Sequence, residues 1–198
     1  MIQSLIQSRF AEHFAESAKL KLAAAQVLTE PLSRAAELLA ATLRAGGKIL
    51  ACGNGGSAAD AQHFAAELVN RFEMERPPLA AIALTTDTSN LTSIANDFAY
   101  QQVFSKQLRA LGRRGDALLA LSTSGNSANV LEAIHVAHEL GIRVVALTGN
   151  GGGKMGALVR ADDAHLCVPH RGTARIQEVH LLCLHCLCDG IDTLLFSR

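Results

Sequence analysis

The sequence predicts an α/β fold in which five parallel strands form one sheet with helices on both faces. Three observations lead to this prediction. Five short apolar runs show little of the polar alternation that marks a strand with one face in water. Segments with helical periodicity separate these runs, as in repeated strand–helix units. A long segment rich in Ala, Leu, Glu and Lys comes first, so a helical extension precedes the sheet.

Two helices are expected in this N-terminal extension. The first covers about residues 2–28, and Pro31 is expected to open the second because proline is favoured in a first helical turn. Gly46 and Gly47 are expected to end it. The first helix carries an apolar stripe that includes Phe10, Phe14, Ala18 and Leu22. An exposed stripe of this kind marks an interaction surface, so we expect contact with another subunit.

The strands and the later helices alternate along the rest of the chain. The runs expected to form strands are Lys48–Cys52, Leu79–Leu84, Ala117–Leu121, Val144–Leu147 and Ala164–Val168. The expected helices lie near Ser57–Phe72, Ser89–Leu111, Ser127–Leu140, Gly153–Arg160 and Thr173–Phe196. No linker interrupts the pattern, so residues 1–198 form one domain, with helices over 1–46 and the sheet core with its C-terminal helix over 47–198. Ligands of such sheets bind beyond the carboxyl ends of the strands.

Composition argues against several classes of function. The 198 residues are 49% hydrophobic and 18% charged with a net charge of zero, which fits a globular domain and gives no electrostatic footprint for nucleic acid or an anionic membrane. No apolar run reaches the roughly 18 residues of a membrane span, and the first ten residues lack the apolar core of a signal peptide. We therefore expect a cytoplasmic protein.

The five cysteines do not suggest a disulfide framework, because their number is odd and three lie in one apolar segment. Cys183, Cys186 and Cys188, with His180 and His185, could form a thiolate zinc site. The alternative is that these cysteines are buried as small apolar side chains, which the surrounding leucines favour.

Two predicted strand-to-helix turns carry the groups that bind phosphate. The first reads Cys52-Gly-Asn-Gly-Gly-Ser57 and the second Ser122-Thr-Ser-Gly-Asn-Ser127. Free backbone N–H groups and a positive helix end hold anions at such turns. The second turn has four hydroxyls where an ordinary N-cap needs one, and it contains no Lys or Arg. This combination suits a sugar phosphate better than a triphosphate with magnesium.

The first turn also matches the dinucleotide fingerprint formally, as Gly53-x-Gly55-x-x-Ala58. That fingerprint requires an acidic residue about 20 positions further on, at the end of the next strand. Here the first candidate is Asp87, which comes too late. A dinucleotide site is therefore disfavoured.

Acid/base or metal-binding chemistry is indicated by His63 and Glu67, which are four residues apart and share one helix face just after the first turn. Imidazole and carboxylate form half of a typical zinc site, although such a pair is also common on ordinary helix surfaces. On the last helix, Gln177 and His185 lie about 80° apart around the axis and about 12 Å apart along it. One straight helix could hardly direct both at one metal, so helix geometry alone leaves the choice among these residues open.

The motifs together carry a family resemblance over essentially the whole chain. They are Cys52-Gly-Asn-Gly-Gly-Ser57, Asp60-Ala-Gln-His63-Phe-Ala-Ala-Glu67-Leu, Arg71-Phe72, Arg76-Pro77, Asn96-Asp97, Ser122-Thr-Ser-Gly-Asn-Ser-Ala-Asn129-Val, Leu147-Thr-Gly149, Gly152-Gly-Lys-Met155 and Arg175-Ile-Gln-Glu178, followed by His180 and His185. In these stretches the chain resembles the phosphoheptose isomerases of the sugar-isomerase (SIS) domain superfamily.

The resemblance implies a three-layer, flavodoxin-like fold in a homotetramer that takes small sugar phosphates. It implies conversion of D-sedoheptulose 7-phosphate to D-glycero-D-manno-heptose 7-phosphate through an enediol, the first step of ADP-heptose synthesis for the lipopolysaccharide core. Glu67 and His185 match the acid/base pair. One Zn²⁺ per subunit is implied, with ligands matching His63, Glu67, Gln177 and His185. The residues matching the substrate-binding set are Asn54, Gly55, Gly56, Ser57, Glu67, Asn96, Asp97, Ser122, Thr123, Ser124, Ser127 and Gln177.

A second reading comes from a paralogue of the same fold, the DnaA initiator-associating protein, which acts as a scaffold in replication initiation. The chain resembles it in the first helices and near the C-terminus. That paralogue lacks ionisable side chains at the positions of Glu67 and His185, and both are present here. The enzyme reading is therefore preferred. One departure from some isomerases is Ala174, which stands where they carry Asp.

Overall fold

The computed structural model describes residues 2–196, which form a parallel sheet between two layers of helices. The strands are β1 (Ile49–Cys52), β2 (Ala81–Ala83), β3 (Ala117–Ser122), β4 (Arg143–Thr148) and β5 (Ala164–Cys167). All pairings are parallel and the strand order is β2-β1-β3-β4-β5, the order of flavodoxin-like folds. The predicted fold class is confirmed.

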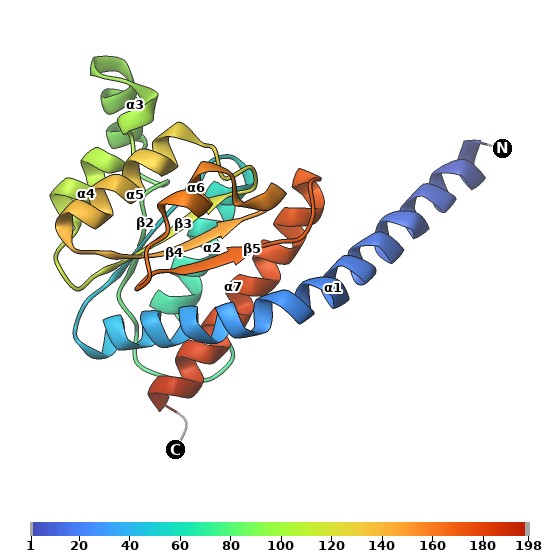
Figure 1. Cartoon of the computed structure of the whole chain (residues 1–198), viewed down its shortest axis with the longest axis horizontal. Coiled ribbons are helices and arrows are strands. Elements are labelled where there is room, and N and C mark those ends of the chain that lie inside the picture. Colours follow the sequence, from blue (N-terminus) through green and yellow to red (C-terminus); the bar gives the residue numbers. More distant parts are fainter. Residues whose placement is uncertain (1, 197–198) are drawn as a thin grey trace.

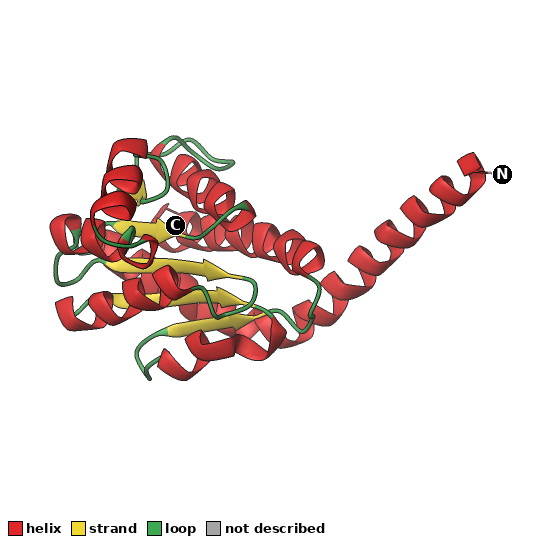
Figure 2. Ribbon diagram, turned by 90° about the horizontal axis from the view of Figure 1, so that it is seen from above, coloured by secondary structure: helices red, strands yellow, loops and turns green. Residues whose placement is uncertain are grey.

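Helices cover both faces of this sheet (Figures 1 and 2). One layer contains α1 (Ile2–Arg44), α2 (Gly56–Val69) and α7 (Thr173–Phe196), and the other contains α4 (Ser105–Leu111), α5 (Ala128–Leu140) and α6 (Gly153–Leu158). Successive β3 residues serve opposite layers, since Leu119 packs with the α1–α7 layer and Leu118 with the α5 layer. Burial on both faces explains why the strands read as unbroken apolar runs.

The expectation of two N-terminal helices is wrong, because α1 runs unbroken for 43 residues with Pro31 inside it. Proline removes one backbone hydrogen bond and costs a helix interior about 3 kcal/mol. On either side of Pro31, Leu28 and Ala35 lie in the same buried cluster against α7 and the sheet. Burial of each large apolar side chain contributes about 1.5–3 kcal/mol, so several of them together offset the proline.

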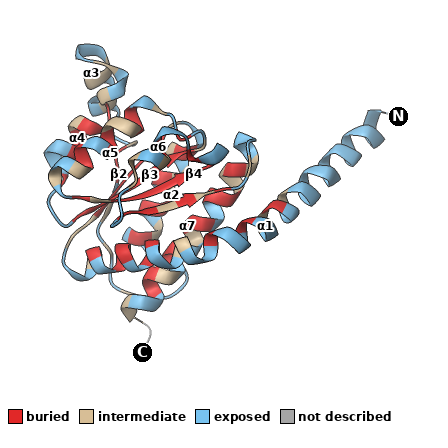
Figure 3. Cartoon of the chain, in the orientation of Figure 1, coloured by how far each residue is buried: buried red, intermediate tan, exposed pale blue. Residues whose placement is uncertain are grey.

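The N-terminal part of α1 projects away from the body of the protomer (Figures 1 and 2). Residues 2–16 are all exposed, as the uniform pale blue of this segment shows in Figure 3, and Leu20 is the first buried residue of the helix. Phe10 and Phe14 are 60% and 81% exposed. The predicted apolar stripe is therefore uncovered within one protomer.

The helix expected over Ser89–Leu111 is in fact three pieces: α3 (Thr88–Asp97), the 3₁₀ turn η1 (Tyr100–Gln102) and α4. Asp87 caps α3 by accepting the Asn90 N–H at 3.0 Å. The helix ends at Asn96 and Asp97, residue types with low helix propensity, and Ala99 is extended. No residue of α3 is buried, so no packing extends the helix past this point.

By length and composition, α7 could cross a membrane, with a mean hydropathy of 1.5 over its most apolar window. Several of its apolar side chains, among them Ile176, Leu184 and Leu187, lie in the core shared with α1 and the sheet. One face of α7 therefore packs as a core helix. A second 3₁₀ turn, η2 (Asn150–Gly152), precedes α6.

Candidate active site

The two predicted phosphate-binding turns lie side by side at the carboxyl edge of the sheet, after the neighbouring strands β1 and β3. Two hydrogen bonds of 2.8 Å join the first turn to the start of α5, directly after the second turn, because the side-chain amides of Asn54 and Asn129 each donate to the other. Within the first turn, Gly55 and Gly56 are exposed, Asn54 is half-buried and Ser57 is buried. The exposed glycine backbone is the accessible part of this turn.

The hydroxyls of the second turn form a cluster. Ser122 Oγ lies 2.9 Å from Ser127 Oγ and 3.4 Å from Ser124 Oγ. Ser127 occupies the N-cap position of α5, yet its side chain makes no capping hydrogen bond. Thr123 is half-buried beside them, and Ser124 is exposed. Helix capping therefore does not account for these hydroxyls. Ser124 Oγ accepts the Asn126 N–H at 3.1 Å, and because Ser124 is exposed its own O–H can donate to an anion.

Gly125 gives the second turn its shape. Its φ is +65°, a conformation that favours glycine, and a Cβ there would collide with the carbonyl oxygen of Gly152. Met155 N donates to Gly125 O at 2.9 Å, and Lys154 N donates to Asn126 Oδ1 at 3.0 Å. The segment that leads into α6 thus stabilises the second turn through these two hydrogen bonds.

Three of the predicted acid/base and metal-binding residues come together between α2 and α7. His63 Nε2 lies 2.9 Å from His185 Nε2 and 3.3 Å from Glu67 Oε1. The ring of Phe72 stacks on His185, with 5.4 Å between the ring centroids. All three polar side chains are half-buried, so the cluster is open to a ligand.

Gln177 does not join that cluster. Its amide packs on the backbone of Gly56, where a Cβ would lie 2.8 Å from the amide carbon and 2.9 Å from Oε1. The helices α2 and α7 therefore meet twice, at Gly56 with Gln177 and about two helical turns further on at His63 with His185. Within one protomer, Gln177 and His185 face different positions, as the straight-helix spacing predicts.

Two residues that the sequence analysis places in family motifs, but not among the site residues, support this cluster. The side chain of Arg76 is buried, and its guanidinium donates to Asp192 Oδ1 at 2.9 Å and to the Glu67 carbonyl at 2.8 Å, which ties the end of α2 to α7. Asp60 lies one turn before His63 on α2. Burial raises the pKa of Asp60 to about 6, although the nearby His63 acts in the opposite direction. The three-residue spacing of Asp60 and His63 was the available sequence signal.

The substrate-binding residues predicted on α3 lie just before a residue that contacts the first turn. Asn96 and Asp97 are exposed at the end of α3, and Asn96 Nδ2 donates to Asp97 Oδ1 at 2.8 Å. Three residues later, the Tyr100 hydroxyl donates to Asn54 Oδ1 at 3.0 Å. Tyr100 was not predicted as a site residue, although it is the only tyrosine of the chain.

The cysteine-rich part of α7 supports burial over a thiolate zinc site. Cys183 and Cys188 are buried, and burial raises the pKa of each thiol to about 12. Cys186 is exposed and burial also raises its pKa. His180 is buried, with its pKa lowered by burial to about 4, and Nε2 donates to the Thr148 carbonyl. Thiols held neutral in this way are poor metal ligands.

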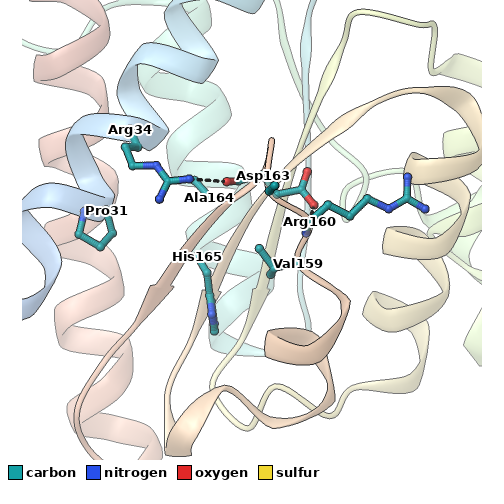
Figure 4. Close-up of a pocket in the computed structure, with 8 residues that line it drawn as sticks. Pro31, Arg34, Val159, Arg160, Asp163, Ala164 and His165 are labelled. Atoms are coloured by element: carbon teal, nitrogen blue, oxygen red, sulfur yellow. Dashed lines mark hydrogen bonds between the residues drawn. The ribbon is translucent and has the colours of Figure 1, made fainter.

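A separate cavity of about 350 Å³ lies at the amino end of β5 (Figure 4). Arg34 extends to the carbonyl of Asp163, whereas Arg160 points away on the other side. The Asp163 carboxylate is occupied by His138 and by the backbone N–H groups of Val144 and Arg160. This cavity is at the opposite end of the sheet from the two phosphate-binding turns, so we do not assign the chemistry to it.

Comparison with known proteins identifies the family. A model described as "SIS domain" matches residues 12–149. The chain is 69% identical to a phosphoheptose isomerase of Aromatoleum aromaticum over 96% of both proteins, and 61% identical to one of Neisseria meningitidis serogroup C over 97% of this chain and 98% of that protein.

Solved structures agree with this match. A phosphoheptose isomerase from Neisseria gonorrhoeae superposes with a TM-score of 0.91 at 57% identity, over 95% of this chain and 99% of that one. A phosphoheptose isomerase from Francisella tularensis superposes with a TM-score of 0.92 at 45% identity, over 94% of this chain and 98% of that one. With the sheet order, the two phosphate-binding turns and the His63–Glu67–His185 cluster, these similarities show that the chain belongs to the SIS-domain family and, within it, to the phosphoheptose isomerases.

Proposed function

We propose that this protein isomerises D-sedoheptulose 7-phosphate to D-glycero-D-manno-heptose 7-phosphate, the first step of ADP-heptose synthesis for the lipopolysaccharide core, in the cytoplasm. The observation that carries the proposal is the meeting of His63, Glu67 and His185 on the same pair of helices whose amino ends lie at the first phosphate-binding turn. A relative that is 69% identical carries the name phosphoheptose isomerase.

The geometry supports phosphate binding at the amino end of α2 and acid/base chemistry further along the same helix. The phosphate lies at the turns, where hydroxyls, backbone N–H groups and helix ends neutralise it. Seven residues separate Gly56 from His63, which is about 10 Å along the helix axis. An extended seven-carbon sugar can therefore keep its phosphate at one end while its carbonyl end reaches the acid/base cluster. Binding energy from the remote phosphate then positions the reacting carbons.

The reaction moves a proton between adjacent carbons through an enediol, which requires a base and an acid. We assign these roles to Glu67 and His185, whose polar atoms both lie within 3.3 Å of His63 Nε2. The stacked ring of Phe72 holds the His185 imidazole in place. Arg76 fixes the backbone of Glu67 from the other side.

Three of the four expected zinc ligands belong to the His63–Glu67–His185 cluster of one protomer. The atoms His63 Nε2, His185 Nε2 and Glu67 Oε1 are the donor types that zinc prefers. Ligand atoms of a tetrahedral zinc lie about 3.3 Å apart. The two imidazole nitrogens are only 2.9 Å apart, so they would have to separate slightly, and residues 2–196 contain no preformed metal cluster. A bound zinc would polarise the oxygens of the substrate.

Gln177, the fourth expected ligand, lies two helical turns away, so we propose that a neighbouring subunit supplies this ligand in a homotetramer. Within its own protomer, Gln177 is placed for its other expected role, contact with the sugar phosphate at the amino end of α2. The DnaA-binding scaffold remains the alternative function. It gives no reason for Glu67 and His185 to meet His63.

The proposed function is tested by incubating the protein with sedoheptulose 7-phosphate and following the aldose product. We expect turnover with this ketose and none with its dephosphorylated form. An absence of turnover with the zinc-loaded tetramer, together with specific capture of DnaA, would favour the scaffold.

Replacement of Ser124 by Ala is expected to weaken binding of the sugar phosphate. The hydroxyl is exposed within the Ser122–Ser127 cluster, and no cation lies in this turn to compensate. A hydrogen bond to a charged group contributes about 1.5–3 kcal/mol, so the dissociation constant should rise about 10- to 150-fold by calorimetry. The matched control is Ser33→Ala on α1, which should leave the dissociation constant unchanged. Equal affinity of the wild type for phosphorylated and dephosphorylated heptulose would exclude this turn as the phosphate site.

Metal analysis of the purified protein is expected to give one zinc per subunit. His63→Ala should lower this ratio at least tenfold, because it removes the ligand that touches both other donors. His135→Ala is the matched control, since this exposed histidine lies on α5 in the opposite helical layer. Full zinc content in His63→Ala would show that the metal binds elsewhere.

A further inference from the structure

The strongest feature that the proposed function leaves unused is a network of three side chains centred on Asn54. Each comes from a different element: Asn54 from the turn after β1, Asn129 from the first turn of α5, and Tyr100 from η1. Asn129 is only 3% exposed, whereas Tyr100 is 61% exposed. The buried amide of Asn129 and the exposed phenol of Tyr100 thus both contact Asn54.

The hydrogen bonds of this network fix the orientation of the Asn54 amide. Its Oδ1 accepts from Asn129 Nδ2 at 2.8 Å and from the Tyr100 hydroxyl at 3.0 Å, which uses both lone pairs. Its Nδ2 donates one N–H to Asn129 Oδ1 at 2.8 Å. One N–H of Asn54 is left for a ligand. A freely turning amide would present its oxygen to a phosphate or hydroxyl about as readily as its nitrogen.

Tyr100 also connects α3 to the first turn. The residues of α3 are all exposed or half-buried, and Phe98 beside it is 61% exposed with the Lys106 ammonium 3.3 Å from its ring centre. Apolar packing of this segment is limited to partly buried side chains such as Leu91 and Ile94. The Tyr100 hydroxyl is therefore a specific polar link between the α3–η1 segment, which carries Asn96 and Asp97, and the turn that carries Asn54.

We propose that Tyr100 and Asn129 are positioning residues that lock the Asn54 amide with its remaining N–H toward the sugar phosphate. The inference rests on the proposed function, in which Asn54 contacts the substrate. Neither residue needs to touch the reacting carbons, so their loss should affect substrate binding and leave the chemical step intact.

The decisive variant is Tyr100→Phe, which removes one oxygen and keeps the ring. Loss of a neutral hydrogen bond predicts a rise in KM for sedoheptulose 7-phosphate of about 2- to 10-fold, with kcat within about twofold of wild type. In an Asn54→Ala background, Tyr100→Phe should produce no further rise, because Tyr100 acts through Asn54. Gln101→Ala, the exposed neighbour in η1, is the matched control with unchanged KM and kcat.

A second readout comes from the composition, because the chain has one tyrosine and no tryptophan. Its intrinsic fluorescence reports Tyr100 alone, and phenol emission responds to hydrogen bonding of the hydroxyl. Asn54→Ala should change this emission in the free protein, and Gln101→Ala should not. Asn129→Ala should raise KM less than additively with Tyr100→Phe, since both act on one amide.

Two results would overturn the proposal: an unchanged KM in Tyr100→Phe, or the same rise in KM in both the wild-type and the Asn54→Ala backgrounds. Failure of the isomerase assignment is distinguishable, because it appears as absent turnover in the wild type. In that event, the dissociation constant of sedoheptulose 7-phosphate replaces KM, and the same comparison of backgrounds decides the inference.

Discussion

Glu67→Gln and His185→Ala are each expected to lower kcat about 10²- to 10⁴-fold, the usual contribution of a general acid or base. Glutamine keeps the shape of Glu67 but cannot take up a proton, and alanine removes the imidazole that lies 2.9 Å from His63. Neither side chain is fully buried, so both variants should fold. Steady-state kinetics with sedoheptulose 7-phosphate, with thermal melting as the check on folding, measures the effect.

The controls for these variants come from the same residue types outside the cluster. Glu73→Gln changes an exposed carboxylate in the loop after α2, and His135→Ala an exposed histidine on α5. Both should keep kcat within about twofold of wild type. Because Glu67 and His185 also stand in the proposed zinc site, kcat is compared at equal zinc content. A folded, zinc-loaded Glu67→Gln or His185→Ala enzyme with near wild-type kcat would remove that residue from the acid/base pair.

The sheet and its order of helices were predictable because local sequence determines them. Runs such as Ala117–Leu121 are buried on both faces, so their composition alone identifies them as strands. The start of α7 was predicted correctly, since Thr173 follows a glycine, and the apolar period continues to Phe196, the last residue that the structure describes. The errors arise where packing overrides local preference. Pro31 looked like a helix start, and only the tertiary contacts of Leu28 and Ala35 carry α1 through it.

In the candidate site, too, the local features were predictable from sequence and the long-range contacts were not. Both phosphate-binding turns were visible in sequence because they need particular residue types, namely glycines and hydroxyls, in consecutive positions. The packing of α2 against α7 was not visible in sequence, since 122 residues separate His63 from His185. Helix arithmetic did correctly indicate that Gln177 and His185 face different points. The bond from Tyr100 to Asn54 spans 46 residues and depends on how α3 ends, which no local pattern encodes.

Disruption of the apolar stripe of α1 is expected to dissociate the proposed homotetramer and to lower activity with it. Phe10 and Phe14 are largely exposed in the protomer, and burial of each in an interface would contribute about 1.5–3 kcal/mol. Replacing both by Glu should therefore weaken association by about 10²- to 10⁴-fold per chain, before any cost of burying the new charges. Light scattering measures the change from four chains of 20.9 kDa to smaller species.

The structure also determines how this test is designed. Removal of residues 1–28 would take Leu20, Ala24 and Leu28 out of the protomer core, so loss of activity could follow from unfolding alone. Point variants, or a truncation that starts at His13 and keeps its carbonyl bond to Arg175, leave that core whole. Ser8→Glu is the matched control, because Ser8 lies about 160° around the helix from Phe10. If the Phe10→Glu, Phe14→Glu protein remains a tetramer, α1 does not form the interface. If it is a fully active monomer with one zinc, the neighbouring subunit supplies no ligand. The isomerase assignment would stand unchanged, since it depends on His63, Glu67 and His185 within one chain.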